Sequence, residues 1–353
     1  MDAKPRDWSM DILRIIACMM VICVHVVAKG INVPKVQTGE WGILNFYDAL
    51  GRPALALFYM ISGSLMLRKD HIDIKDLWIR KIFRISMLLL FWIIFYYVMD
   101  TGLKYVIREP QNAFKNFFTT ENKYHLWYLR VQFSLYVFTP VYAIAVRKLD
   151  RKTVNYFFTI FIIFNIIQHT FLSIPRIPNW LKWPVNNLIY VEISDAVGYF
   201  LLGYFLTDDR QFDTEKYSNG KLLGIYIVSL ILAAAVNHIF SLIINRPSAA
   251  LHGNSSLPIL FESVTLFILI KRKFSNYKFN KKIGKLIKNI SKSTLFIYLI
   301  HPFFIDRMAK DFGFNILNYN PLISVPFAVI LYFIVGVICG VILEKIPILN
   351  KLL

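Results

Sequence analysis

The chain has 353 residues, of which 56% are hydrophobic, and it carries 40 lysines and arginines against 22 aspartates and glutamates. This apolar content excludes a disordered chain and exceeds what a soluble domain of this length needs. The net charge of +18 would suggest nucleic acid as the partner of a soluble protein. In a membrane protein the same excess serves topology, so we expect no nucleic-acid partner.

Successive apolar runs of about 17–24 residues match the thickness of a bilayer core. They predict an all-α polytopic integral membrane protein with about ten transmembrane helices. The predicted spans are residues 9–29, 48–67, 82–100, 125–146, 153–173, 189–206, 221–244, 256–270, 290–308 and 321–344. No connection is long enough for a soluble domain, so we expect residues 1–353 to form a single membrane domain.

The basic residues are distributed unevenly between the two sides of this predicted topology. With ten spans and a cytoplasmic N-terminus, the cytoplasmic segments hold roughly 24 lysines and arginines and the outer loops roughly 11. The largest basic block covers residues 271–292. Both termini are therefore expected to be cytoplasmic. Arg14 interrupts the first apolar run, which favours an uncleaved helix over a signal peptide.

The first span carries an arginine and a histidine, Arg14 and His25. Their separation of eleven residues corresponds to about 1100°, roughly 20° past three turns, so both lie on one helix face about 16 Å apart. Asp11 lies within reach of the same stripe. A snorkelling arginine and a histidine bonded to a neighbouring helix would explain each residue alone. Their shared face instead indicates a polar path through the protein.

A basic cluster, "WIRKIFRIS", begins the third span at residues 78–86. A cytoplasmic anchor explains Arg80 and Lys81, whereas Arg84 lies one turn deeper. Three cations here would equally suit a phosphorylated cosubstrate, because arginine binds phosphate through a planar fork. The sequence leaves both interpretations open.

Histidines recur near the opposite ends of two further spans. His125 opens the fourth span beside Trp127, and an aromatic belt accounts for the tryptophan alone. His301 lies in the outer half of the ninth span, where Pro302 loosens the helix hydrogen bonding. His238 has no comparable motif and is interpreted as a packed polar group.

The polar side chains therefore separate by depth. Arg14, Lys81 and Arg84 gather on the cytoplasmic side, while His25 and the two other histidines lie in the outer half. Cations suit a phosphate-bearing donor, and neutral imidazoles suit proton transfer. This pattern predicts a donor inside and an acceptor outside. The three cysteines have no metal-ligand spacing, so no metal is expected.

Four segments carry a family resemblance. "MDILRIIACMMVICVH", residues 10–25, resembles the opening helix of the membrane acyltransferase 3 family. "LFYMISGSLM", "HLWYL" and "IYLIHPFF" resemble its second-helix, fourth-helix and late-helix signatures. The ending "VILEKIPILNKLL" is similar to the surface-polysaccharide O-acyltransferases that lack an added extracytoplasmic domain.

The resemblance implies a multi-pass plasma-membrane enzyme that transfers an acyl group, acetyl or succinyl, from acyl-CoA as cosubstrate, with acetyl-CoA the first expectation. The acceptor would be a hydroxyl of a surface or lipid-linked glycan. His25 and Arg14 match the family's first-helix catalytic residues. Lys81 and Arg84 match its third-helix basic pair, which is usually two arginines, and join Arg14 as expected CoA-binding residues.

The resemblance also completes the expected acceptor site, which would be formed by His125, Trp127 and His301. His25 would act as general base or would receive the acyl group itself, and both roles stay open. A transporter or flippase for a polar glycan-related substrate is the main alternative, since it would also bury histidine and arginine. A structural or sensory membrane protein is the third. The sequence does not specify the acyl group, the acceptor or the oligomeric state. It is compatible with a monomer or an oligomer.

Overall fold

A computed structural model describes residues 6–68, 72–119, 123–187, 193–208 and 212–343. Every regular element in these ranges is helical. The chain divides into two compact units, the first formed by Met1–Arg68 and Lys148–Val341 and the second by Lys69–Arg147 and Ile342–Leu353. The single-domain expectation stays a prediction.

The first unit contains both the N-terminal helices and most of the C-terminal half. Its helices are α1 (Ser9–Ala28), α2 (Gly39–Gly51), α3 (Ala54–Met66), α9 (Arg151–Ile160), the π-helix η2 (Phe161–Ile167), α10 (Gln168–Ser173), α11 (Asn179–Asn187), α12 (Asp195–Phe205), the 3₁₀-helix η3 (Thr214–Lys216), α13 (Asn219–Ile244), α14 (Leu257–Phe274), α15 (Lys281–Phe312), the 3₁₀-helix η4 (Ile316–Asn318) and α16 (Pro321–Leu343).

The second unit is smaller. It contains α4 (Ile74–Asp76), the π-helix η1 (Leu77–Ile82), α5 (Phe83–Thr101), α6 (Leu103–Arg108), α7 (Pro110–Thr119) and α8 (Trp127–Lys148). Three of these, α4, η1 and α5, follow one another without a break and form one long helical rod.

Seven helices or helix runs in the described ranges are long and apolar enough to cross a membrane. They are Ser9–Ala28, Gly39–Met66, Ile74–Thr101, Trp127–Lys148, Arg151–Ser173, Asn219–Ile244 and Pro321–Leu343. Each overlaps one of the predicted spans, so the all-helical membrane class is confirmed. The predicted count of about ten is not.

The three predicted spans outside this set are helical but are shorter or more polar. The described part of 189–206 contains α12, which has 11 residues. Both α14 and α15 carry charged residues, and α15 is 32 residues long. Most of residues 291–305 in α15 is buried by protein, so this stretch does not need the apolar surface that lipid would require. Residues 344–353, which contain the C-terminus expected to be cytoplasmic, lie outside the described ranges.

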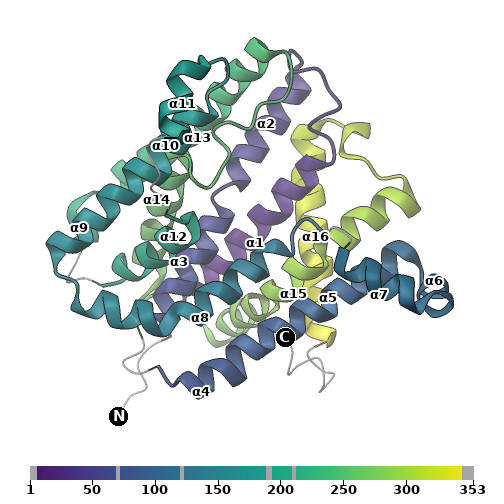
Figure 1. Ribbon diagram of the computed structural model, residues 1–353, viewed down its shortest axis with the longest axis horizontal. Coiled ribbons are helices and arrows are strands. Elements are labelled where there is room, and N and C mark those ends of the chain that lie inside the picture. The colour runs from purple at the N-terminus through teal and green to yellow at the C-terminus, as the bar shows by residue number, and fades with distance from the viewer. Residues whose placement is uncertain (1–5, 69–71, 120–122, 188–192, 209–211, 344–353) are drawn as a thin grey trace. The chain divides into compact units, whose positions relative to one another are not determined.

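The helix α1 packs against α2, α3, α14 and α15 within the first unit (Figure 1). Its contacts with α15 follow the same order along both helices. The Ser291 hydroxyl donates to Asp11 at 2.8 Å, and Lys29 pairs with Asp306 at 2.7 Å. The two helices therefore run side by side in the same direction.

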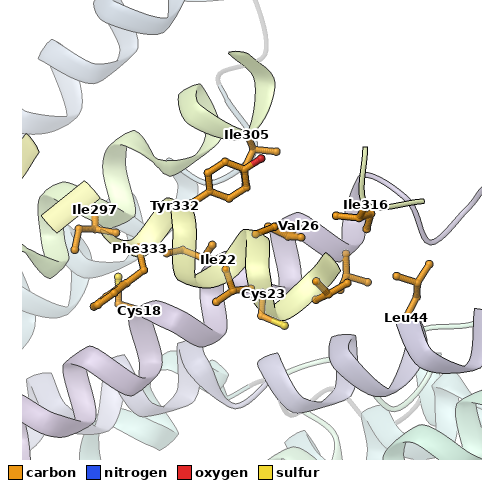
Figure 2. Close-up of a cluster of buried hydrophobic side chains, with 14 residues drawn as sticks. Cys18, Ile22, Cys23, Val26, Leu44, Ile297, Ile305, Ile316, Tyr332 and Phe333 are labelled. Atoms are coloured by element: carbon orange, nitrogen blue, oxygen red, sulfur yellow. The ribbon is translucent and has the colours of Figure 1, made fainter. Parts of the chain in front are cut away.

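An apolar layer fills the space between α1, α15 and α16. Figure 2 shows Cys18 and Ile22 of α1 near Ile297 of α15 and near Tyr332 and Phe333 of α16. All of these side chains are buried. Such burial excludes water from the middle of the helix pair.

Two glycines allow α3 and α12 to approach at backbone distance. A Cβ at Gly63 would lie 1.7 Å from the Phe200 carbonyl oxygen, and one at Gly203 would lie 2.0 Å from the Met60 carbonyl oxygen. Small residues of this kind let membrane helices pack closely. Gly63 of the segment "LFYMISGSLM" therefore has a packing role.

Substituting Gly63→Ala should separate α3 from α12, because the new methyl group would overlap a backbone carbonyl that cannot rotate away. Overpacking of this kind costs about 1–3 kcal/mol. We expect a lower midpoint of thermal unfolding for the detergent-solubilised protein, measured by fluorescence-detected size exclusion. Gly224→Ala is the matched control, since a Cβ at Gly224 meets nothing within 4 Å. Equal midpoints for the two variants would contradict this account of the contact.

Candidate functional site

Two of the predicted site residues, His25 and His301, stack on each other. Their ring centroids lie 5.1 Å apart with an interplanar angle of 28°. His25 is in the last turns of α1 and partly buried, whereas His301 on α15 is completely buried. The parallel packing of α1 with α15 brings together two histidines that are separated by 276 residues in the sequence.

The orientation of His301 follows from the proline after it. In an α-helix, the N–H of residue 302 would donate to the carbonyl of residue 298, but proline has no N–H. Tyr298 therefore has a free carbonyl lone pair, and His301 Nδ1 lies 2.7 Å from that oxygen. Because a carbonyl only accepts, Nδ1 carries the hydrogen, and in the neutral ring Nε2 carries the lone pair. The His-Pro step thus selects a tautomer.

A second polar cluster lies on α2 and the connection between α13 and α14. Asp48 accepts from Arg52 Nε at 3.0 Å and from Arg52 Nη2 at 2.7 Å, which is a bidentate pair. His252 Nδ1 lies 2.7 Å from Asp48 Oδ2. The side chains of Asp48 and His252 are 7% and 1% exposed. We call these three residues the Asp48 cluster.

The Asp48 cluster lies on the part of α2 that packs against the His25 end of α1. Cys23 Sγ lies 3.4 Å from the Tyr47 carbonyl, and a Cβ at Gly51 would be 2.7 Å from the Met20 carbonyl. His25 is within electrostatic range of both Asp48 and Arg52. The His25 end of α1 is therefore close to the partly buried Asp48–Arg52 ion pair as well as to a second imidazole.

Arg14 lies at the other end of α1, in a separate ionic cluster. Asp11 accepts from Arg6 at 2.7 and 2.9 Å, from Ser291 at 2.8 Å and from Arg14 at 3.4 Å. The Arg14 side chain is 33% exposed, whereas that of Asp11 is 5% exposed. A guanidinium has five N–H donors, and this long bond occupies one of them. Arg14 can therefore contact an additional anion.

A pocket of about 380 Å³ opens one turn beyond the two stacked histidines. Val26, the neighbour of His25, lines it, as does Ile305, which follows His301 by four residues. Asn315 and Asn318 add amide groups, and Tyr332 adds an aromatic ring. Amides and aromatic rings beside apolar walls are a typical lining for a small polar organic ligand.

The remaining predicted site residues belong to the second unit. Lys81 lies in the π-helix η1 and Arg84 in the first turn of α5, both partly buried. His125 is 1% exposed and packs edge-on against Tyr96 with centroids 5.3 Å apart. Trp127 is 41% exposed on α8. Arg84 and Tyr96 are 12 positions apart on α5, about 18 Å, so the cations and His125 are at different depths.

Arg80, by contrast, pairs with Asp76 at 2.8 Å and its side chain is 78% exposed. An exposed arginine with a carboxylate partner in the preceding turn has the geometry of a surface anchor. This distinguishes Arg80 from the less exposed Lys81 and Arg84.

The Asp48 cluster and one other buried acid were missed by sequence reasoning. Asp48 and Arg52 are an i,i+4 pair at the start of an apolar run, which is a readable signal of a buried ion pair. His252 lies in a connection and gives no periodic signal. Glu262 on α14 is completely buried, and neither carboxylate oxygen has a hydrogen-bond partner in the described part of the chain.

Within the described ranges, no group of three or more histidine, cysteine, aspartate or glutamate side chains is arranged to hold a metal ion.

Comparison with known proteins adds one finding. Residues 7–345 match the model of a protein family described as an acyltransferase domain, which covers helices of both units. No curated protein and no solved structure matches the chain.

Replacing Asp11 by alanine should destabilise the protein, because it removes the buried acceptor that Arg6, Arg14 and Ser291 share. Loss of a buried charged partner costs about 1–3 kcal/mol. We expect a lower thermal midpoint in detergent. Asp311→Ala is the control, since Asp311 pairs with Arg307 at 3.6 Å with both side chains about half exposed, and such pairs contribute little. An Asp11→Ala midpoint no lower than that of the control would contradict the buried-acceptor role.

Proposed function

Since this chain belongs to the acyltransferase 3 family of membrane acyltransferases, we propose that it transfers an acyl group from cytoplasmic acyl-CoA to a hydroxyl of a surface or lipid-linked glycan. Acetyl-CoA is the proposed donor. The observation that carries the proposal is the stacking of His25 on His301 at the C-terminal end of α1, with Arg14 near the other end of the same helix.

The proposed topology has ten spans, with both termini cytoplasmic and the protein in the plasma membrane. Parallel packing of α1 with α15 supports it. Two parallel membrane helices require an odd number of crossings between them. Five of the seven candidate spans lie between α1 and α15, so α12 and α14 either both cross or both do not. If both cross, the spans number ten when α15 is included.

The proposed donor site is at the Arg14 end of α1. Arg14 would contact a phosphate of CoA, because its guanidinium has donors that Asp11 does not use. Lys81 and Arg84 of the second unit are proposed as further phosphate contacts, each tested by its own substitution. An extended pantetheine arm would span the roughly 16 Å from Arg14 to His25.

The proposed acceptor site is the pocket beyond His25 and His301. Its two asparagines offer hydrogen bonds to hydroxyl groups, and Tyr332 offers a surface for a sugar ring. Its volume of about 380 Å³ suits one small polar group of a larger glycan rather than the whole acceptor. His125 and Trp127 of the second unit are proposed as further contacts to the acceptor.

Two routes satisfy the chemistry at His25. In direct transfer, His25 takes the hydroxyl proton as the new C–O bond forms, the C–S bond breaks, and the CoA thiolate then receives that proton. In the two-step route, His25 attacks the thioester, CoA leaves as the thiol, and the acyl-imidazole then reacts with the hydroxyl. Both routes need a neutral imidazole at the start.

Inverted membrane vesicles that contain the protein and are given radiolabelled acetyl-CoA should incorporate label into their polysaccharide or lipid-linked glycan. His25→Ala should lower the rate about 10²–10⁴-fold, the usual contribution of a positioned proton acceptor. His238→Ala is the control, because His238 packs edge-on against Trp41 at 5.2 Å and has no role in the mechanism. Full activity of His25→Ala would remove the mechanism. Movement of a labelled substrate without any covalent product would favour the transporter instead.

Arg84→Ala should raise the KM for acetyl-CoA about tenfold or more, since charge-assisted hydrogen bonds to phosphate contribute about 1.5–3 kcal/mol. Arg80→Ala should leave KM unchanged because Arg80 is exposed and paired with Asp76. The measurement is the donor concentration dependence of the vesicle assay. Equal KM values for both variants would exclude Arg84 from the donor site.

A further inference from the structure

The Asp48 cluster has the chemistry of a second reactive histidine. The Asp48 carboxylate accepts hydrogen bonds from both sides, because Arg52 forms the bidentate pair and His252 Nδ1 lies 2.7 Å from Oδ2. A carboxylate cannot donate, so Nδ1 of His252 carries the hydrogen. The remaining ring nitrogen, Nε2, then carries the lone pair when the ring is neutral.

The hydrogen bond to Asp48 also fixes the orientation of the ring of His252, whose side chain is 1% exposed. In its neutral form His252 is therefore held in one tautomer, as an aspartate holds the histidine of a catalytic triad.

The Nε2 atom of His252 is buried, and it has no hydrogen-bond partner in the described ranges. A buried polar atom without a partner costs about 1–3 kcal/mol, so its retention requires an explanation. A role for His252 in anchoring the connection between α13 and α14 does not explain it, because other hydrogen bonds already anchor this connection. Leu251 already donates to Asn237 at 2.9 Å, and Ser256 donates to the Leu251 carbonyl at 2.8 Å. Asn254 accepts from Tyr199 at 2.7 Å.

The position of the cluster relates it to His25. Asp48 is adjacent to Tyr47, whose carbonyl accepts from Cys23, and His25 is within electrostatic range of both Asp48 and Arg52. His252 therefore lies on the same side of the first unit as the stacked histidines. Its ring is hydrogen-bonded to Asp48, which interacts electrostatically with His25.

We propose that His252, oriented by Asp48, is a second catalytic histidine that takes the proton from the acceptor hydroxyl while His25 carries the acyl group. This inference rests on the proposed function and selects the two-step route. An acylated His25 nitrogen has no lone pair for the hydroxyl proton, so a separate acceptor is needed, and Nε2 of His252 supplies one.

The proposed steps balance as follows. His25 attacks the thioester carbonyl, the C–S bond breaks, and CoA leaves as the thiol with the proton lost from the His25 ring. The acceptor oxygen then bonds to the acyl carbon as the acyl–nitrogen bond breaks. Its proton goes to Nε2 of His252, where Asp48 stabilises the imidazolium. That proton returns, directly or through water, to the ring nitrogen of His25 that the acyl group left.

The test uses His252→Asn, because an asparagine amide can still donate to Asp48 but cannot accept a proton. The full-length variant is assayed in inverted vesicles with radiolabelled acetyl-CoA, and acid-quenched samples are measured for label on the protein and on the glycan. We expect transfer to the glycan to fall at least about 100-fold, while label accumulates on the protein. His25→Ala in the same background should abolish the label on the protein.

Several outcomes would overturn the inference. These are wild-type transfer rates in His252→Asn, or loss of both protein label and transfer in a variant that folds. If His252→Asn does not reach the membrane, His252→Gln replaces it, and failure of both to fold assigns His252 a purely structural role. His238→Asn is the matched control and should keep the wild-type rate. Absence of acetyl-CoA-dependent transfer in the wild type would instead refute the proposed function, and with it this inference.

Discussion

A polar side chain inside a membrane helix is stable only if the protein supplies a partner, and this constraint organises the first unit. At the two ends of α1, polar side chains meet groups from α15, a helix distant in sequence. Asp11 accepts from Ser291, and Lys29 pairs with Asp306. Between these ends lies an apolar layer formed with α15 and α16. The same arrangement that removes the cost of polar residues in lipid also gathers the reactive ones.

Sequence reasoning was most accurate where the residues of a single helix are enough to identify that helix. The first span was predicted at 9–29 and α1 covers Ser9–Ala28, because a long apolar run with polar residues at both ends defines a membrane helix locally. The spacing of Arg14 and His25 could be read for the same reason. The family prediction is confirmed by the match over residues 7–345.

Other features depend on contacts between distant parts of the chain. The predicted span 48–67 begins within α2, which starts at Gly39, since Thr38 caps that helix and the helix ends before Pro53. The pairing of Asp48 with His252 joins residues 204 positions apart, and no local pattern indicates it. Likewise, the predicted span 290–308 lies within α15, but the extension of that helix to Lys281–Phe312 and the covering of most of its middle by neighbouring helices are not visible in the local pattern.

His301 and His252 each have one ring nitrogen oriented by a fixed acceptor, and the two acceptors differ. A backbone carbonyl released by Pro302 serves His301, whereas a carboxylate neutralised by Arg52 serves His252. A carbonyl is uncharged and therefore stabilises an imidazolium less than a carboxylate does. The two rings are consequently suited to different tasks, one to a fixed neutral contact and the other to holding a proton for a short time.

The pairing of α1 with α15 also has a consequence for how the protein is made. The first helix leaves the ribosome long before residues 281–312 are synthesised, so Asp11 and His25 enter the bilayer before Ser291 and His301 exist. During that interval, these polar side chains destabilise the inserted nascent helix, because their partners are not yet present to offset the free-energy cost of placing them in the membrane. The site is therefore completed only after α15 has been synthesised, and a chain truncated before α15 would retain α1 without the partner that stabilises it.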